Sequence, residues 1–196
     1  MLMELAERIV SFLNEMPEVK GCALYGSLAN GTYDDLSDID INVDVSGCDN
    51  GRFMLTLSER IGKKINVYYS DYAPSLVPER YIVSLAVDEN NPTRVVDLCC
   101  MAEPHCTTVT KAQVRALNDP FSHMLKLWTA NWKHCVRGAD CRSDILRMAE
   151  KIKIENAQTK SEREILEETL GWLEANAPRE KRRFVNSCRR IFEVRQ

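Results

Sequence analysis

The chain has 196 residues, and its 26 Lys and Arg against 29 Asp and Glu give a formal net charge of −3. Hydrophobic residues make up 44% of the chain and charged residues 28%, a composition that excludes a disordered protein. No apolar run approaches the roughly 18 residues that a membrane-spanning helix needs, so we expect no membrane partner.

The N-terminal segment lacks the features of a secretory signal. It carries Glu4, Glu7 and Arg8 where a signal peptide would be apolar. Without an export signal, the eight cysteines of the chain are expected to be reduced thiols rather than disulfides. The sequence therefore predicts a cytoplasmic protein.

The first half of the chain alternates between helix and strand patterns. Apolar side chains at three- and four-residue steps predict a helix from Leu2 to Met16, and a short apolar run then ends at Gly26–Ser27. Asp38–Val45 alternates strictly between polar and apolar residues, which is typical of a half-buried strand. Further elements are predicted at residues 51–61 (helix), 64–69 (strand) and 94–101 (strand), with the apolar segment 81–87 undecided.

The second half of the chain reads as consecutive amphipathic helices. Asp119 followed by Pro120 is typical of a helix start, and Gly138 of a helix end. Further helices are predicted near residues 141–157, near residues 161–176 and after Pro178. Four helices with short connections indicate a four-helix-bundle-like domain.

Charge is divided unevenly between these two halves. Residues 1–106 hold 8 Lys and Arg against 17 Asp and Glu, a net charge of −9, whereas residues 107–196 hold 18 against 12, a net charge of +6. The change of charge coincides with the change from mixed to helical patterns. We therefore place a domain boundary near residues 106–110, between a domain of mixed helix and strand patterns and an all-α domain.

Gly26 and Ser27 end the first apolar run and enter a turn. A glycine there lets the backbone approach a phosphate, and the Ser27 hydroxyl can donate a hydrogen bond to phosphate oxygens. Ser37, at the end of the same turn, either caps that turn or also contacts phosphate. These residues predict a phosphate-binding segment.

Carboxylates follow this segment at a regular spacing. Asp38 and Asp40 project from the same face of the predicted strand, about 6.6 Å apart, and such a pair can hold the two divalent ions of a phosphoryl-transfer site, which lie ~3.5–4 Å apart. Oxygen ligands beside phosphates favour Mg²⁺ or Mn²⁺. Asp97 interrupts an apolar run, where a charge is costly unless it is paired, coordinated or solvated. It is the expected third carboxylate if its strand neighbours the strand of Asp40.

The sequence GS followed by SDID, with a later hydrophobic–Asp–hydrophobic strand, resembles the polymerase-beta-like nucleotidyltransferase superfamily. Within it, the chain looks most similar to the small bacterial aminoglycoside and lincosamide nucleotidyltransferases. The resemblance covers residues 22–45 and 94–100. It implies that residues 1–106 form an α/β (α+β) nucleotidyltransferase domain with a small mixed sheet, which the all-α, four-helix-bundle-like domain of residues 107–196 follows.

The resemblance also implies roles for individual residues. Gly26 and Ser27 would contact the triphosphate of an NTP, with ATP as the expected donor. Asp38 and Asp40 would bind the metal, and Asp97 would be a further ligand or the general base. The implied reaction moves an NMP to a hydroxyl of a small molecule, such as an aminoglycoside-type antibiotic, and releases pyrophosphate. In this superfamily the third acid can also lie on the strand after the first crossover helix, where residues 64–69 offer Asn66 instead.

Other acceptors and other roles stay open at this stage. The acidic first domain would attract a polycationic small molecule, whereas the basic second domain leaves a tRNA end as an alternative, and a protein hydroxyl is a third acceptor. A non-catalytic, antitoxin-like partner module is the rival from another class, and a homodimer is allowed by analogy.

Several weaker features have a structural interpretation. Cys99, Cys100, His105 and Cys106 lack the usual spacing of zinc ligands, so structural cysteines are expected. Trp128 and Trp132 lie on the apolar stripe of one helix, which favours a core position over stacking on a base. The basic face of the last helix is expected to be solvated, with a phosphate or RNA track as the alternative, and comprises Lys181, Arg182, Arg183, Arg189 and Arg190.

Overall fold

A computed structural model describes residues 2–73, 77 and 79–194. The chain divides into two compact units, the first containing residues 1–88 and 94–118 and the second residues 89–93 and 119–196. Residues 107–118, which the sequence analysis assigned to the helical domain, are thus counted with the first unit. Each unit is described by itself.

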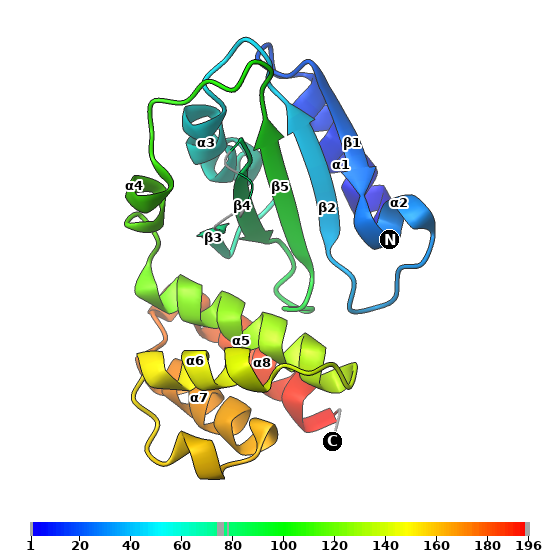
Figure 1. The fold of residues 1–196 in the computed structure, drawn as a ribbon. Coiled ribbons are helices and arrows are strands. Elements are labelled where there is room, and N and C mark those ends of the chain that lie inside the picture. Colours follow the sequence, from blue (N-terminus) through cyan, green and yellow to red (C-terminus); the bar gives the residue numbers. More distant parts are fainter. Residues whose placement is uncertain (1, 74–76, 78, 195–196) are drawn as a thin grey trace. The chain divides into compact units, whose positions relative to one another are not determined.

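The first unit is built on a mixed sheet (Figure 1). Within the described residues its strands follow the spatial order β1-β2-β5-β4-β3. Strands β2 and β5 pair in parallel, and the other neighbours are antiparallel. The bounds are β1 Gly21–Tyr25, β2 Ile39–Asp44, β3 Tyr69–Ala73, β4 Tyr81–Ala86 and β5 Val95–Met101.

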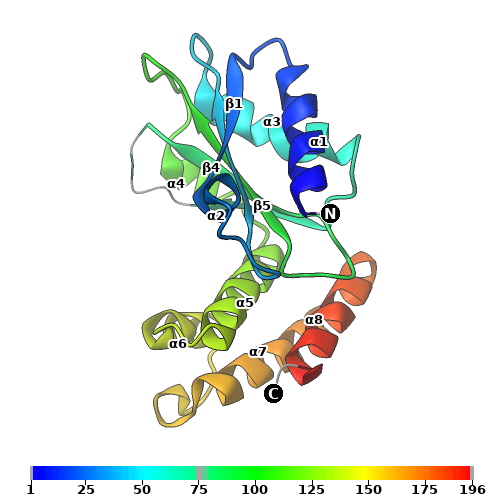
Figure 2. The ribbon, with the colours of Figure 1, turned by 90° about the vertical axis from the view of Figure 1, so that its right-hand side faces the viewer.

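Helices α1 (Leu2–Asn14) and α3 (Asn50–Gly62) lie on the same side of this sheet (Figure 2). Their apolar stripes pack with the inward side chains of the strands in one hydrophobic core. On β2 the inward residues Ile39, Ile41 and Val43 are each 0% exposed, whereas the polar residues between them are half-buried. The alternation predicted from the sequence is therefore present, and it leaves the polar residues of β2 on the sheet face opposite α1 and α3.

The strand predicted at residues 64–69 is wrong in position. Lys64 and Ile65 still donate backbone hydrogen bonds to Ile61, at 2.8 and 3.0 Å, so these residues complete the end of α3. Pairing with β4 starts at Tyr68, whose N–H donates to the Ala86 carbonyl at 2.9 Å, and β3 starts at Tyr69. Asn66 is exposed and precedes the strand.

Two short helices complete the first unit. Helix α2 (Gly26–Asn30) follows β1 directly, and α4 (Lys111–Arg115) starts with a capping box between Thr110 and Gln113. The sequence analysis did not identify α4, because a five-residue helix carries little periodicity.

The second unit contains a helix near each predicted position, but the helix predicted near residues 141–157 ends at Lys151. The helices are α5 (Pro120–Val136), α6 (Arg142–Lys151), α7 (Glu162–Asn176) and α8 (Arg182–Val194), with short 3₁₀ turns at Ala157–Thr159 and Arg179–Lys181. Helix α7 packs against α5, α6 and α8. The interpretation of this unit as a four-helix bundle domain stays a prediction. Among the described residues, no helix combines the length and the apolar character that crossing a membrane requires.

Candidate active site

Gly26 lies against the Asp40 carboxylate at the point where β1 passes into α2. Its φ angle is +67°, in the left-handed region, and a Cβ atom added to it would lie 2.6 Å from Asp40 Oδ2. Only glycine satisfies both the backbone angle and the contact. The structure thus brings the Gly-Ser turn and the second acid of the SDID segment together.

The strand register places Asp40 directly opposite two other polar residues. Its Cα partner on β1 is Tyr25, and its partner on the parallel strand β5 is Asp97. Side chains at paired positions project from the same face of a sheet. Asp97 therefore neighbours Asp40, as the sequence analysis required of a third carboxylate. Asp38 precedes β2 by one residue and is half-buried, like Asp40 and Asp97.

The same register continues across the sheet to two residues that the sequence analysis missed. Ser84 on β4 is the partner of Asp97, and Asp71 on β3 is the partner of Ser84. We call the resulting line across the five strands the polar row; it comprises Tyr25, Asp40, Asp97, Ser84 and Asp71. Ser84 is 0% exposed and Asp71 is 1% exposed. A serine inside the largely apolar strand β4 was the available signal for Ser84, and only the register shows that Ser84 and Asp71 join this row.

Tyr25 and the acids of the row interact electrostatically. Burial raises the pKa of the Tyr25 phenol far above its usual value. The negative charges of Asp40 and Asp97 act in the same direction, and Arg80 opposes this shift. The phenol therefore stays neutral at physiological pH and can donate a hydrogen bond.

Ser37 has a defined role in the turn before β2. Its hydroxyl donates to Asp34 Oδ1 at 2.8 Å and accepts from the Asp34 N–H at 2.9 Å. Ser37 is 6% exposed, so the structure shows the turn-capping role, and contact with a phosphate stays a prediction. Ser27 is half-buried, and its carbonyl accepts from the Thr32 N–H at 3.0 Å.

The carboxylate oxygens of the polar row are the kind of ligand that a hard divalent ion prefers. The acids do not, however, form a complete set of metal ligands by themselves. Across residues 2–73, 77 and 79–194, no three or more His, Cys, Asp or Glu side chains are grouped closely enough to hold a metal ion. Mg²⁺ is commonly held by one or two carboxylates and by the phosphates of the substrate. Asp38, Asp40 and Asp97 could supply those carboxylates. Asn42 Oδ1, on the same strand as Asp40, is a buried oxygen without a hydrogen-bond partner in the described part of the chain.

The structural interpretation of Trp128 and Trp132 is confirmed. They are 0% and 2% exposed, and Trp128 Nε1 donates to the Leu166 carbonyl at 2.9 Å. Lys133 is also buried, at 4% exposed, and its ammonium group lies 3.4 Å from the Thr93 carbonyl. The cysteines are free thiols, and Cys99 and Cys100 are buried in β5.

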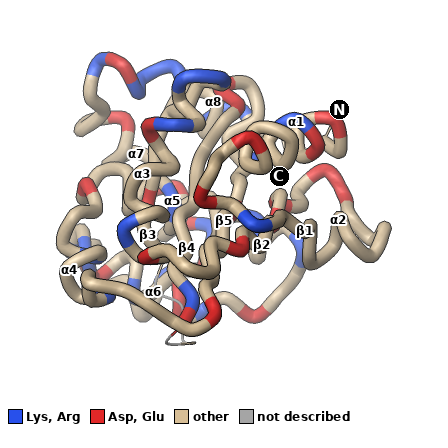
Figure 3. Tube along the Cα trace, turned by 90° about the horizontal axis from the view of Figure 1, so that it is seen from above, with Lys and Arg blue, Asp and Glu red and all other residues tan. Residues whose placement is uncertain are grey.

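The basic residues of the last helix are partly neutralised. Lys and Arg positions gather along α8 (Figure 3), but Arg189 forms an ion pair with Glu174 at 2.7 Å, and Lys181 forms one with Asp119 at 3.1 Å. Two of the five cations proposed for an RNA track are thus already paired within the second unit.

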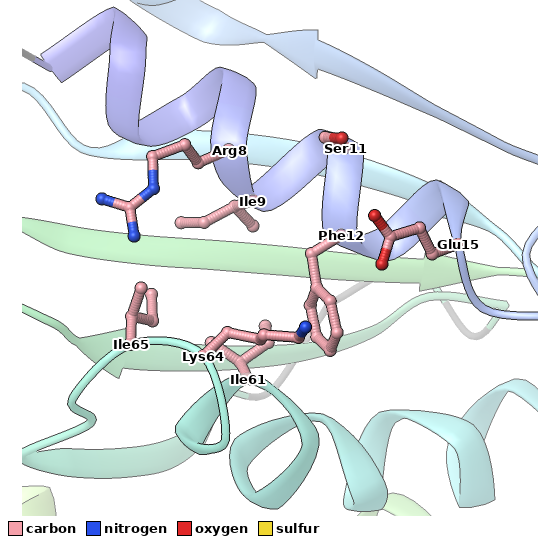
Figure 4. A pocket seen from close by; sticks show the side chains of 8 residues that line it. All are labelled: Arg8, Ile9, Ser11, Phe12, Glu15, Ile61, Lys64 and Ile65. Carbon is pink, nitrogen blue, oxygen red and sulfur yellow. The ribbon is translucent and has the colours of Figure 1, made fainter.

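A pocket of about 230 Å³ lies between α1 and the end of α3 (Figure 4). Because α1 and α3 cover the sheet face opposite the polar row, this pocket is separate from the candidate site. Its apolar lining residues are Ile9, Phe12, Ile61 and Ile65, and its polar ones are Arg8, Ser11, Glu15 and Lys64.

Comparison with known proteins supports a class for the first unit. The family model described as Polymerase beta, Nucleotidyltransferase matches residues 7–82. The matched segment contains Gly26, Ser27, Asp38 and Asp40 but ends before β5, so Asp97 lies outside it. The match supports a polymerase-beta-like nucleotidyltransferase domain in this part of the chain.

Comparisons with individual proteins and with solved structures do not identify a substrate or a partner. No curated protein matches the sequence. A chain in the structure titled "structure of GLD-2/RNP-8 complex" is similar with a TM-score of 0.33 and 12% identity, over 90% of this chain. The present chain spans 59% of that chain's length.

Proposed function

We propose that the chain is a metal-dependent nucleotidyltransferase that transfers an NMP from an NTP, with ATP as the expected donor, to a hydroxyl group. The observation that carries this proposal is the position of Asp40, which lies against the Gly26 backbone on one side and directly opposite Asp97 on the other. This arrangement sets a close-approach turn for phosphates beside a pair of carboxylates. The turn and Asp40, but not Asp97, lie in the segment that matches a nucleotidyltransferase family model.

In the proposed reaction an acceptor hydroxyl oxygen attacks the α-phosphorus of the NTP. A new P–O bond forms, the bond from the α-phosphorus to the oxygen that bridges to the β-phosphate breaks, and pyrophosphate leaves with that electron pair. Gly26 and Ser27 would hold the phosphates, and Asp38, Asp40 and Asp97 would hold Mg²⁺ or Mn²⁺. The bound metal would neutralise the triphosphate and so favour in-line attack. Asp97 either completes the metal site or accepts the hydroxyl proton.

The acceptor proposed first is a small hydroxyl compound with positive charge, such as an aminoglycoside-type antibiotic. The excess of acidic residues over residues 1–106 would attract a polycation. The ion pairs of Arg189 and Lys181 reduce the free positive charge on α8 and on the turn before it, which weakens the case for RNA. A tRNA end, a protein hydroxyl and a non-catalytic partner role are alternative outcomes of the test.

The test is pyrophosphate release with Mg²⁺ and each of the four NTPs, against aminoglycosides, lincosamides and bulk tRNA. Asp40→Asn should abolish release. The matched control is Asp44→Asn, because Asp44 is half-buried on the same face of β2 but is bound to Ser46, its carboxylate accepting from the hydroxyl at 2.6 Å and from the N–H at 2.8 Å. Transfer that persists in Asp40→Asn would refute the assigned site. Mg²⁺–NTP binding without transfer to any acceptor would favour the non-catalytic role.

A further inference from the structure

Ser84 occupies an unusual place for a hydroxyl group, because it lies in the middle of the apolar strand β4 and is 0% exposed. A buried hydroxyl without a partner costs free energy. The Ser84 hydroxyl avoids this cost because it donates a hydrogen bond to Asp97 Oδ1. The serine of β4 is therefore bound to an acid of the candidate site.

The strand register determines which neighbour each side of Asp97 faces. Asp97 lies between Ser84 on one neighbouring strand and Asp40 on the other. Its Oδ1 accepts from Ser84, and no other hydrogen bond to its carboxylate is formed within the described residues. One oxygen is thus held toward β4, which fixes the rotation of the carboxylate and keeps Oδ2 for a different partner.

We infer that Ser84 is a positioning residue of the metal site, which holds the Asp97 carboxylate in the orientation that a divalent ion requires. This inference rests on the proposed function, because it assumes that Asp97 binds the ion. Hydrogen-bond partners of metal-ligating carboxylates orient their ligands, and their removal typically weakens metal binding by 10–100-fold.

The experiment measures Mn²⁺ affinity by electron paramagnetic resonance in the presence of a non-hydrolysable ATP analogue, so it needs no knowledge of the acceptor. Ser84→Ala should bind Mn²⁺ about tenfold more weakly than the unmodified protein. Ser84→Thr keeps the hydroxyl and should restore the affinity to within about twofold, a rescue that filling space alone would not give. Ser84→Cys keeps the size of the side chain with a weak donor, and should resemble Ser84→Ala.

The matched control is Ser70→Ala. Ser70 lies on β3 beside Asp71 and is paired with Leu85 of β4, so the change alters a serine of the same strand pair without touching Asp97. Its Mn²⁺ affinity should equal that of the unmodified protein. Thermal unfolding of every variant identifies any loss of fold. If Ser84→Ala does not fold, the Mn²⁺ affinity of Ser84→Cys is compared with that of the unmodified protein instead.

The outcomes distinguish failure of the proposed role of Ser84 from failure of the proposed metal site. If Asp40→Asn loses Mn²⁺ binding while Ser84→Ala and Ser84→Cys bind like the unmodified protein, the role of Ser84 is refuted and the proposed site stands. If the unmodified protein does not bind Mn²⁺ with the ATP analogue, or if Asp40→Asn binds it equally well, the proposed site and the role of Ser84 are both refuted.

Discussion

Gly26 shows how one residue joins the backbone to the chemistry of the site. Its left-handed backbone angle lets β1 turn into α2, and its missing side chain leaves room for the Asp40 carboxylate. A side chain at this position would have to displace Asp40, and so would disturb the acid that faces Asp97.

Gly26→Ala should therefore reduce nucleotide binding by more than tenfold, since the new Cβ atom would lie 2.6 Å from Asp40 Oδ2. Gly31→Ala is the matched control, because Gly31 has nearly the same φ angle, +68°, and nothing within 4 Å of an added Cβ atom. Both variants should lose about 1–2 kcal/mol of stability from the left-handed backbone. Calorimetric titration with Mg²⁺–ATP and urea unfolding measure the two effects, and equal binding losses in both variants would contradict the contact with Asp40.

At the scale of single elements, α3 is fixed at its N-terminus by Asp49. The Asp49 carboxylate accepts from the Arg52 N–H at 2.8 Å and, from a distant loop, from the Thr108 N–H at 2.7 Å and the Thr108 hydroxyl at 2.6 Å. Burial by itself would raise the pKa of Asp49, but these hydrogen bonds outweigh it and lower the pKa to about 2. The cap thus ties residues 107–108 to the start of a helix that covers the sheet.

Asp49→Ala should destabilise the protein by about 1–2 kcal/mol at pH 7 through loss of the cap. The usual pKa of Asp in an unfolded chain is about 3.9, so the ionised cap stabilises the fold above that pH, and its contribution falls as the pH drops from about 4 toward 2. Urea unfolding at several pH values should show the difference between the two proteins shrinking over that range. Asp35→Ala, at an exposed carboxylate, is the control, and a difference that stays constant with pH would contradict the role of the charge.

Replacing each of two glycines of α3 with alanine should change the stability of the protein in opposite directions. A Cβ atom on Gly51 would overlap Thr107 Oγ1 and lie 2.6 Å from Val109 Cγ2, whereas one on Gly62 meets nothing within 4 Å. Gly62→Ala should be neutral or stabilising by up to about 1 kcal/mol, the ordinary gain for a helical glycine. Gly51→Ala should be destabilising by about 1–3 kcal/mol. Thermal unfolding of both variants tests this, and a stabilising Gly51→Ala would show that the loop at residues 107–109 is not packed on α3.

Most elements could be predicted from the sequence, but their pairing could not. Alternation around Asp40 identified β2, and the apolar run around Asp97 identified β5, because both patterns are local. That Asp97 lies opposite Asp40 depends on a parallel pairing between distant segments. The contribution of Ser84 was hidden for the same reason, since only its cross-strand partner distinguishes it from an ordinary strand serine. Asn66 was considered because alternation at residues 64–69 was read as a strand, whereas hydrogen bonds to Ile61 extend the end of α3 into that segment.

At the scale of the whole molecule, the uneven distribution of charge along the sequence carries a prediction about acceptors. With a net charge of −9 over residues 1–106, kcat/KM for a polycationic acceptor should fall several-fold when ionic strength rises from about 0.05 to 0.5 M, because salt screens long-range attraction. A neutral hydroxyl acceptor of similar size should show little change. Initial rates at low acceptor concentration measure this effect, and equal salt dependence for the two acceptors would argue against electrostatic attraction.

The parallel pairing of β2 with β5 has a consequence for the order of folding. Only residues 26–38 separate β1 from β2, whereas α3, β3 and β4 lie between β2 and β5 along the chain. Parallel neighbours need such long connections, and closing them costs entropy before the contacts repay it. Until then β2 has an open edge, and Asp40 lacks the neighbour that completes the acid pair. In refolding from denaturant, the capacity to bind Mg²⁺–nucleotide should therefore return no earlier than amide protection in β5.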